Sequence, residues 1–138
     1  MLTLSGLCIG SFPDLIGRLY LHATNTGRII CTDQVNNTVT CINLNGDIVF
    51  SLTDEALVAP YGVCIDKADN IYVVGIDSNC ILRFSPDAKE NVSILNSKHG
   101  LARPFVILHT KDGSILVSNN SGKEVRMYVA GHSLGCSS

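Results

Sequence analysis

The chain has 138 residues, the length of one domain; 46% of them are hydrophobic and only 16% are charged. This composition supplies ample apolar material for a core and argues against an intrinsically disordered chain. The net charge is −2, and Lys and Arg are scattered without a basic run, so a nucleic-acid-binding face is not expected. No apolar run is as long as the roughly 18 residues that a transmembrane helix needs, so no membrane span is expected either.

The beginning of the chain bears on its compartment. Residues 1–12 are apolar but contain no Lys or Arg, and they lack the basic start and cleavage site of a secretory signal. We therefore expect a cytoplasmic protein whose six cysteines are reduced and buried. Asn-x-Ser/Thr triplets at Asn36, Asn91 and Asn119 would matter only in a secreted protein, and turn-rich sequences supply such triplets by chance.

Taken in chain order, the sequence is a series of similar segments. Residues 2–14 parallel residues 42–54 at a shift of 40 positions. Residues 27–45 parallel residues 69–87 at a shift of 42, and these parallel residues 113–128 at a shift of 44. The polar turn between strands keeps its length, and three apolar strand positions coincide in the three copies: Ile29, Ile71 and Ile115; Val39, Ile81 and Val125; and Ile42, Phe84 and Tyr128.

Each copy is expected to contain four strands, which are clearest in the middle copy. Apolar runs predict strands at residues 62–66, 71–75, 81–85 and 92–95, separated by clusters of Asp, Asn, Gly and Pro that favour turns. No segment shows sustained helical periodicity, and one helical turn is expected at most, over residues 54–58.

A repeat of about 40–45 residues with four strands is typical of a β-propeller blade. A four-stranded sheet cannot bury both faces alone, so such sheets stack on one another, and strands between neighbours are apolar on both faces. The predicted fold is all-β: a single domain that is a partial propeller of about three four-stranded antiparallel blades. Residues 1–14 are expected to end a preceding blade, and the blades to occupy residues 17–55, 59–97 and 102–138, the last one incomplete.

The middle copy resembles the NHL repeat. That repeat reads Pro, aromatic, Gly, a short apolar strand ending in Asp, a strand with Ile-Tyr-Val, and a strand with Arg and Phe. The matching segments are Pro60-Tyr-Gly-Val-Cys-Ile-Asp66, Asn70-Ile-Tyr-Val-Val74 and Ile81-Leu-Arg-Phe-Ser-Pro-Asp87.

The other two copies depart from this pattern. The third keeps Pro104 and Phe105 but has Val106 where Gly62 stands, and the first has Arg18-Leu19-Tyr20 in place of Pro-Tyr-Gly. Related propeller repeats stay open, and WD-type repeats are the less favoured of them because their Trp-Asp signature needs Trp, which is absent. Because the resemblance implies a propeller that is typically six-bladed, three blades are expected to be a fragment, a truncated chain, or a unit that needs further blades to close the ring.

The sequence shows no catalytic constellation, and no cofactor or metal is expected. It has no Cys-x-x-Cys pair, no Gly-x-Ser-x-Gly segment and no Gly-rich phosphate loop. Cys31 and Cys41 lie on the two strands of one predicted hairpin and are expected to face each other. His22 and His109 occupy nearly matching places on first strands and are the one hint of a metal near the propeller axis.

The carboxylates are expected to serve turns. Asp66 has Thr24 and Thr110 at the matching places of the other copies, so successive first strands do not supply a ring of acidic ligands.

Binding residues are expected at one end of the propeller, where the loops into each blade meet the turns after the second strands. Arg103, Tyr61 and Phe105 are the strongest candidates, because Arg and Tyr are favoured in interface hot spots. The competing interpretation is that Tyr61 and Phe105 only wedge adjacent blades together. Further candidates at this end are Arg18, Asn36, Asp77, Asn120 and Lys123.

The favoured hypothesis is a non-enzymatic protein-interaction module, which resembles the C-terminal substrate-recognition propeller of tripartite-motif (TRIM) NHL proteins. The resemblance implies a RING-type ubiquitin ligase family, but the catalytic RING is absent from this chain, so the chain is not expected to be an enzyme. The modest basic charge favours a protein partner over RNA, and RNA stays open. The alternatives are a fragment of a metal-dependent NHL-like lyase or lactonase, and a scaffold without a function of its own.

Overall fold

The computed structural model describes residue 6 and residues 19–129, which form eleven strands and one short 3₁₀ helix. The strands are β1 (Leu19–Ala23), β2 (Ile29–Asp33), β3 (Thr38–Ile42), β4 (Ile48–Leu52), β5 (Pro60–Ile65), β6 (Ile71–Gly75), β7 (Cys80–Phe84), β8 (Asn91–Leu95), β9 (Ile107–His109), β10 (Ile115–Asn119) and β11 (Glu124–Tyr128), and the helix is η1 (Ser97–His99).

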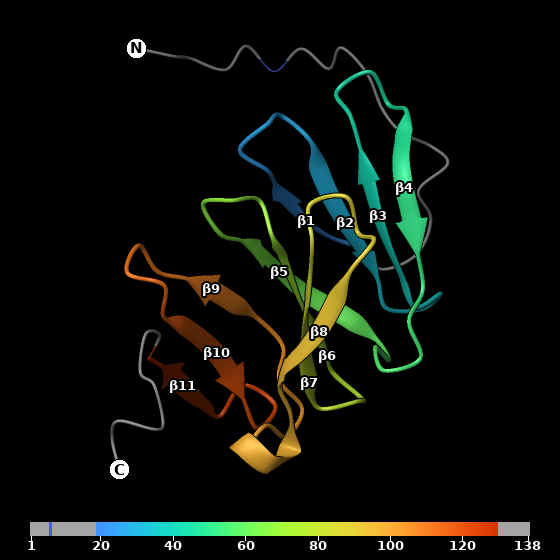
Figure 1. Ribbon diagram of the computed structural model, residues 1–138. Helices are drawn as coiled ribbons and strands as arrows, with labels where there is room; N and C mark the ends of the chain where they lie inside the picture. Colours follow the sequence, from blue (N-terminus) through green and yellow to red (C-terminus); the bar gives the residue numbers. More distant parts are fainter. Residues whose placement is uncertain (1–5, 7–18, 130–138) are drawn as a thin grey trace.

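The strands form three antiparallel sheets that follow one another along the chain (Figure 1). Strands β1–β4 make the first sheet and β5–β8 the second, each four-stranded, and β9–β11 make a three-stranded third sheet. We call them the first, second and third blades. The fold class is that of a partial β-propeller, and β2, β6 and β10 begin at Ile29, Ile71 and Ile115, the positions that coincide in the sequence copies.

The turn after the first strand is built alike in each blade. Asp66 Oδ1 accepts hydrogen bonds from the N–H groups of Ala68 and Asn70, at 2.9 and 3.0 Å. The hydroxyls of Thr24 and Thr110 accept backbone N–H groups four residues further on in the same way. Such side chains replace a backbone acceptor and so define the turn, which confirms the turn role expected for Asp66.

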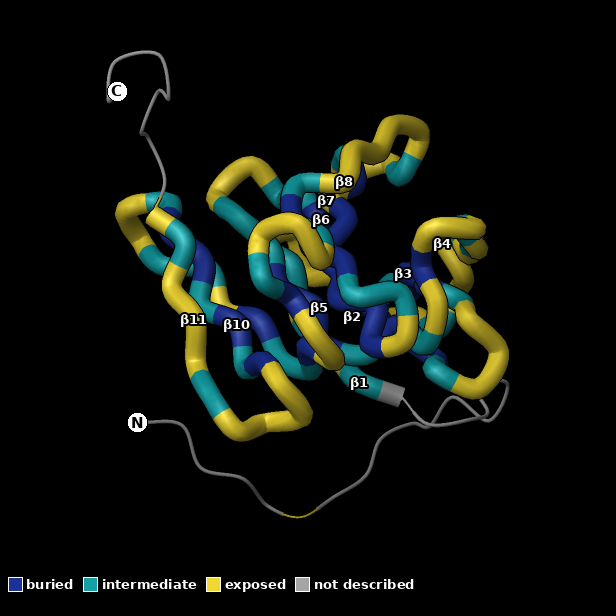
Figure 2. The backbone as a smooth tube through the Cα atoms, turned by 90° about the horizontal axis from the view of Figure 1, so that it is seen from below, coloured by how far each residue is buried: buried dark blue, intermediate teal, exposed yellow. Residues whose placement is uncertain are grey.

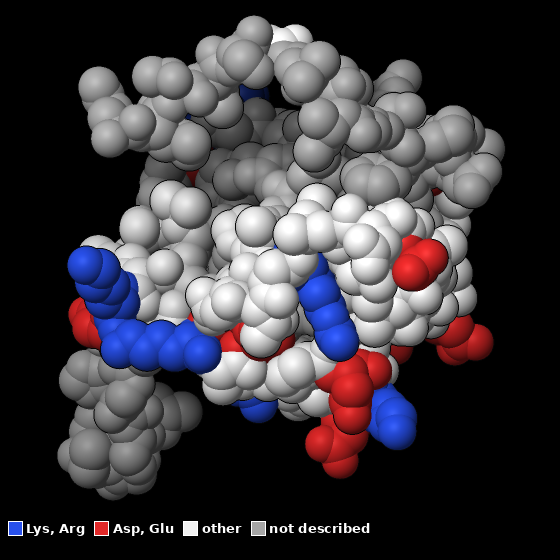
Figure 3. Space-filling model, turned by 90° about the horizontal axis from the view of Figure 1, so that it is seen from above, with Lys and Arg blue, Asp and Glu red and all other residues white. Residues whose placement is uncertain are grey.

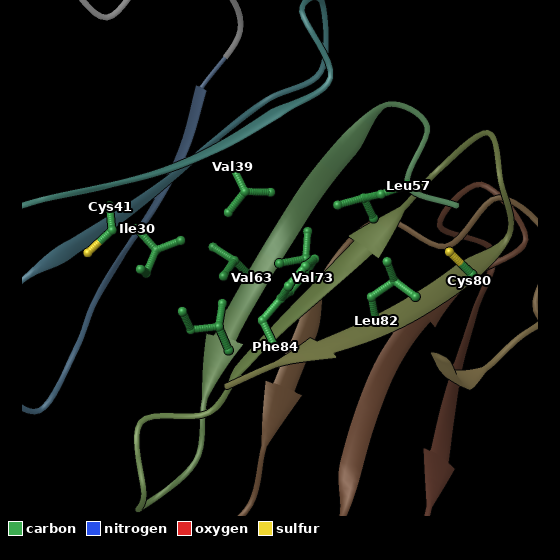
Figure 4. Close-up of a cluster of buried hydrophobic side chains, with 10 residues drawn as sticks. Ile30, Val39, Cys41, Leu57, Val63, Val73, Cys80, Leu82 and Phe84 are labelled. Atoms are coloured by element: carbon green, nitrogen blue, oxygen red, sulfur yellow. The ribbon is translucent and has the colours of Figure 1, made fainter. Parts of the chain in front are cut away.

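Apolar side chains from successive blades fill the spaces between them. Figure 4 shows Ile30, Val39 and Cys41 of the first blade facing Val63 and Val73 of the second. A second buried cluster joins the second blade to the third, and its members are Cys64, Tyr72, Val74, Ile81, Leu95, Leu101, Ile107, Ile115 and Val117. Buried residues run through the strands inside the stack, whereas the turns are exposed (Figure 2).

The strands of the second blade lie close to their predicted places. Strand β6 matches the prediction, and β5, β7 and β8 begin one or two residues earlier than predicted. No helical turn forms over residues 54–58, where Leu57 N–H donates to Asp54 C=O in a tight turn and the Leu57 side chain is buried between the blades.

The register corrects the expectation for two cysteines. Cys41 lies opposite Ile30, and Cys31 lies opposite Thr40. Because successive side chains of a strand project to opposite faces, Cys31 and Cys41 lie on different faces of the first blade. Residues 19–129 contain no helix of sufficient length and apolar character to cross a membrane.

Candidate binding surface at the blade entry loops

The loops that lead into the second and third blades lie against the turns after the second strands. The N–H of Ile76 donates to the carbonyl of Ala59 at 3.1 Å, and the N–H of Asn120 donates to the carbonyl of Ala102 at 2.8 Å. In the second and third blades, these backbone bonds bring together the two kinds of segment from which the candidate residues come.

Three aromatic side chains, one from each blade, form a row at this end. The ring centroids of Tyr20 and Tyr61 are 5.0 Å apart, and those of Tyr61 and Phe105 are 6.1 Å apart in an edge-to-face arrangement. Both separations are typical of favourable aromatic pairs. We call these three residues the aromatic row. The row wedges adjacent blades together, and because all three residues are partly exposed it also presents ring surface to solvent.

Arg103 lies beside the aromatic row. Its Nη1 is 2.8 Å from Asp77 Oδ1, and its Cζ is 5.8 Å from the centroid of the Phe105 ring. A guanidinium over an aromatic face is attracted to the ring, whereas an exposed ion pair such as this one contributes little to stability. Because both charged side chains are more than half exposed, Arg103 can exchange Asp77 for an acidic group of a ligand at low energetic cost.

Two asparagines join each blade to the next, and neither is among the binding residues predicted from the sequence. Asn37 Oδ1 accepts the N–H of Ala59 at 2.8 Å, and Asn79 Oδ1 accepts the N–H of Arg103 at 2.7 Å. Both asparagines have positive φ, which Asn tolerates better than most residues. The repeat pattern could have identified them, because Asn37 and Asn79 are 42 positions apart and each is the last residue of a turn of the same length. The third copy has Lys123 at this position.

The remaining candidates lie in turns. Asn36 is exposed, but its side-chain amide donates to Asp33 Oδ2 at 2.9 Å. Burial opposes ionisation of Asp33, yet hydrogen bonds from Asn36 lower the pKa of that carboxyl below its usual value. Asn120 and Lys123 are exposed on the turn between β10 and β11. Arg18 lies outside the described residues.

A polar group occupies the opposite end of the blades. The Tyr72 hydroxyl donates to Asp66 Oδ2 at 2.9 Å, and the Tyr72 ring lies 5.3 Å from the His109 ring. Burial and the hydrogen bond to Asp66 raise the pKa of Tyr72. Beside this group is a shallow depression of about 180 Å³ that Lys67 and Lys111 also line.

The two histidines of interest project from different faces of their blades. His22 lies opposite Ile30, whereas His109 lies opposite Ile115, the counterpart of Ile29. The one-residue difference in register turns their side chains in opposite directions. Burial lowers the pKa of His22. Within residues 19–129, no three His, Cys, Asp or Glu side chains come together in a group that could hold a metal ion.

The described cysteines are buried free thiols: Cys31, Cys41, Cys64 and Cys80. Burial raises the pKa of each of them, that of Cys64 to about 12. Thiols with raised pKa values are protonated at neutral pH and are poor nucleophiles. These four side chains therefore serve as core residues.

No protein-family model and no curated protein sequence matches the chain. Solved structures of propellers do match its fold. A catalytically inactive variant of virginiamycin B lyase from Staphylococcus aureus, crystallised with quinupristin, is 20% identical with a TM-score of 0.60, and the match covers 78% of this chain and 39% of that one.

Two further structures give the same result. The WD40 β-propeller domain of Doa1 is 15% identical with a TM-score of 0.69, and the match covers 89% of this chain and 40% of that domain. A streptogramin B lyase is 18% identical with a TM-score of 0.61, and the match covers 82% of this chain and 40% of the lyase. The chain therefore has the fold of β-propeller blades and spans about two fifths of the length of these propellers.

Proposed function

We propose that this chain is a non-enzymatic recognition module that binds a segment of a partner protein at the aromatic row. The observation that carries the proposal is the continuous row of Tyr20, Tyr61 and Phe105 across three blades, partly exposed and flanked by Arg103. A few residues supply most of the binding energy of a protein interface, and Tyr and Arg are enriched among them. Because the row is held by contacts between blades, it offers a preorganised surface.

The resemblance of the middle copy to the NHL repeat supports the same role. In TRIM-NHL proteins the propeller presents a partner to a separate RING-type ubiquitin ligase domain, and we extend that recognition role, without ligase activity, to this chain. A cytoplasmic location is part of the proposal, since the four described cysteines are free.

The charge distribution favours a protein partner over RNA. In the view from above, Lys and Arg side chains are interspersed with Asp and Glu along the described surface (Figure 3). RNA binding rests largely on neutralising phosphates with a concentration of basic side chains. At the candidate surface Arg103 is already paired with Asp77, which leaves little net positive charge around it.

The test is selection of peptide ligands on the complete chain. Peptides displayed on phage are selected against the immobilised protein, and their affinity is then measured by fluorescence anisotropy. We expect Arg103→Ala to weaken selected peptides by about tenfold. The matched control is Lys89→Ala, an exposed cation on the turn between β7 and β8, which is expected to change nothing.

Two results would contradict the proposal. One is a set of peptides whose affinity responds to Lys89→Ala and not to Arg103→Ala. The other is a labelled single-stranded RNA that binds more tightly than every selected peptide and loses affinity steeply with salt.

A metal-dependent lyase or lactonase is the second candidate. It is favoured by the fold shared with two lyases and by His22 and His109 on the first strands of two blades. The one-residue difference in their register speaks against a joint metal site. Elemental analysis of the purified chain separates the two candidates, because stoichiometric zinc or calcium is expected only for the enzyme.

A further inference from the structure

The loop that leads into the third blade holds the backbone of Arg103 in place. The Arg103 N–H donates to Asn79 Oδ1 at 2.7 Å, and the Arg103 carbonyl accepts the N–H of Ser121 at 3.2 Å. Two residues further on, the Phe105 N–H donates to the carbonyl of Ser118 at 3.0 Å. Because this loop is already ordered, a ligand that binds Arg103 has to immobilise little more than the side chain.

The second blade builds the equivalent loop without an arginine. Ala59 stands at the position of Arg103 when the two copies are aligned at their shift of 44 residues. The Ala59 N–H donates to Asn37 Oδ1 at 2.8 Å in the same way, and both Ala59 and Arg103 have positive φ and precede a proline. The loop therefore forms with a methyl group at this position, and the fold itself does not require the guanidinium of Arg103.

The Arg103 guanidinium lies between a carboxylate and an aromatic ring. Its Nη1 is 2.8 Å from Asp77 Oδ1, and its Cζ is 5.8 Å from the centroid of the Phe105 ring. Arginine carries several N–H donors, and within residues 19–129 the bond to Asp77 is the one hydrogen bond that this guanidinium makes. Because the two charged side chains are 55% and 52% exposed, a ligand can approach the guanidinium from solvent and compete with Asp77 for it.

We propose that the partner segment carries a carboxylate that takes the place of Asp77 on Arg103, beside an apolar side chain that lies on the rings of Tyr61 and Phe105. The pairing rests on the proposed function, since it names the chemistry of the segment that binds the aromatic row. A ligand carboxylate can accept two parallel N–H bonds from a guanidinium, whereas Asp77 accepts one. Arg103 is therefore the residue that determines specificity for an acidic segment.

The spacing of the surface fits neighbouring side chains of one extended segment. The ring centroids of Tyr61 and Phe105 are 6.1 Å apart, and Arg103 Cζ is 5.8 Å from the Phe105 centroid. In an extended chain, alternate side chains project to the same side at intervals of roughly 7 Å. The acidic residue and the apolar residue are therefore expected two positions apart in the segment.

The charges around Arg103 favour an acidic segment over a basic one. The exposed Lys123 lies on the turn whose Ser121 N–H contacts the Arg103 carbonyl, and the neighbouring Glu124 is bound to Arg126 at 2.7 Å. A basic segment would meet two cations and a carboxylate that is already paired, whereas an acidic segment meets both cations. A single carboxylate also does not need the concentration of basic side chains that RNA needs.

A double-mutant cycle on the complete chain tests the pairing. Peptides selected on phage are measured by fluorescence anisotropy against the parent and Arg103→Ala, first as selected and then with Glu or Asp replaced by Gln or Asn. Each change alone is expected to weaken binding about tenfold, and the two together no further, because both remove the same bond. Amidating the peptide terminus distinguishes a terminal carboxylate from an acidic side chain. Ala59 at the equivalent position indicates that the Arg103→Ala chain folds, which circular dichroism checks.

Asp77→Asn is expected to change affinity in the opposite direction. The variant keeps the size of the side chain but removes the competing charge, so acidic peptides should bind about threefold more tightly, and less so at high salt. The matched control is Asp47→Asn, which removes an exposed carboxylate on the turn between β3 and β4 and is expected to change nothing.

The possible outcomes separate this pairing from the proposed function. If Arg103→Ala weakens peptides with and without an acidic group to the same extent, the carboxylate pairing is wrong and the binding function stands. Selected peptides without a carboxylate, or weaker binding of acidic peptides to Asp77→Asn, overturn the pairing in the same way. Peptides that bind equally well to the parent and to Arg103→Ala contradict the proposed function itself.

Discussion

The contact between the first and second blades and the contact between the second and third blades use equivalent positions, but different hydrogen bonds cross them. In the first contact the Thr32 hydroxyl donates to the carbonyl of Tyr61 at 2.5 Å. In the second contact Val74 stands at the position of Thr32, and Gly62 N–H donates to the carbonyl of Phe105 at 2.9 Å instead. One contact is bridged by a side chain, and the other depends on a close approach of two backbones.

This difference explains the Gly of the Pro-Tyr-Gly segment. A Cβ on Gly62 would lie 2.8 Å from Val106 Cα and nearer still to the Phe105 carbonyl oxygen. Backbone atoms cannot move aside as the end of a flexible side chain can. The third blade carries Val106 where Gly62 stands, and among the described residues no further blade approaches it there.

The largest expected effect is that of Gly62→Ala, which breaks the second contact. We expect a loss of about 3 kcal/mol or more in the free energy of unfolding, measured by urea denaturation, because the two strands must separate. Gly27→Ala is the control. Gly27 has a positive φ, and its nearest neighbour, Leu44 Cδ1, would be 4.0 Å from an added Cβ, so only backbone strain of about 1 kcal/mol is expected. Equal losses in the two variants would disprove the close-approach explanation.

Asp66→Asn tests a turn that touches both contacts. The Asp66 carbonyl accepts the Asn25 amide of the first blade, and its carboxylate accepts the Tyr72 hydroxyl within the second contact. The variant is expected to lose about 1–2 kcal/mol at neutral pH, because an amide cannot accept every bond that the carboxylate accepts.

The same variant has a pH signature. Partial burial opposes ionisation of Asp66, but hydrogen bonds from Asn70 and Tyr72 lower its pKa in the folded state. A lowered folded pKa means that the stabilisation is complete above the unfolded value of about 3.9 and is lost as pH falls through the folded value. The stability difference between parent and Asp66→Asn should therefore shrink below about pH 4. A difference that grows in acid would show that the pKa of Asp66 is not lowered.

Asn37→Gly and Asn79→Gly compare the two contacts directly. Gly keeps the positive φ at low cost while removing the side-chain acceptor, so each variant should lose about 1 kcal/mol. Thermal unfolding of both variants beside the parent gives the measurement. Similar losses would show that the asparagine bond is a repeated element, whereas a loss in one variant alone would assign it to one contact.

The smallest expected effect on stability is that of Arg103→Ala. The exposed pair with Asp77 should contribute less than about 1 kcal/mol, and the contribution should fall with added salt. Urea denaturation at low and high salt measures it. A larger loss of unfolding free energy that does not depend on salt would mean that Arg103 stabilises the contact between blades and is not available to bind a ligand.

Much of the fold could be predicted from local pattern. The coincidence of Ile29, Ile71 and Ile115 placed the second strand of every blade, and Asp66 and its two Thr counterparts were correctly assigned to turns. Both rest on interactions within a few residues. The candidate surface was only partly predictable: Tyr61, Phe105 and Arg103 were named, but Tyr20 was not, since its place in the aromatic row depends on the neighbouring blade.

Short apolar runs separated by turn-forming Asp, Asn and Gly determine that the chain makes successive antiparallel sheets and where most strands lie, because these preferences act within one hairpin. The tertiary structure alone decided the register that separates His22 from His109, the approach of Phe105 to Gly62, and the exposure of Leu108 and Met127. The approach of Phe105 and the exposure of Leu108 and Met127 depend on which sheets pack together, and no local preference encodes which faces meet. The register of the two histidines is set by the pairing within two different hairpins.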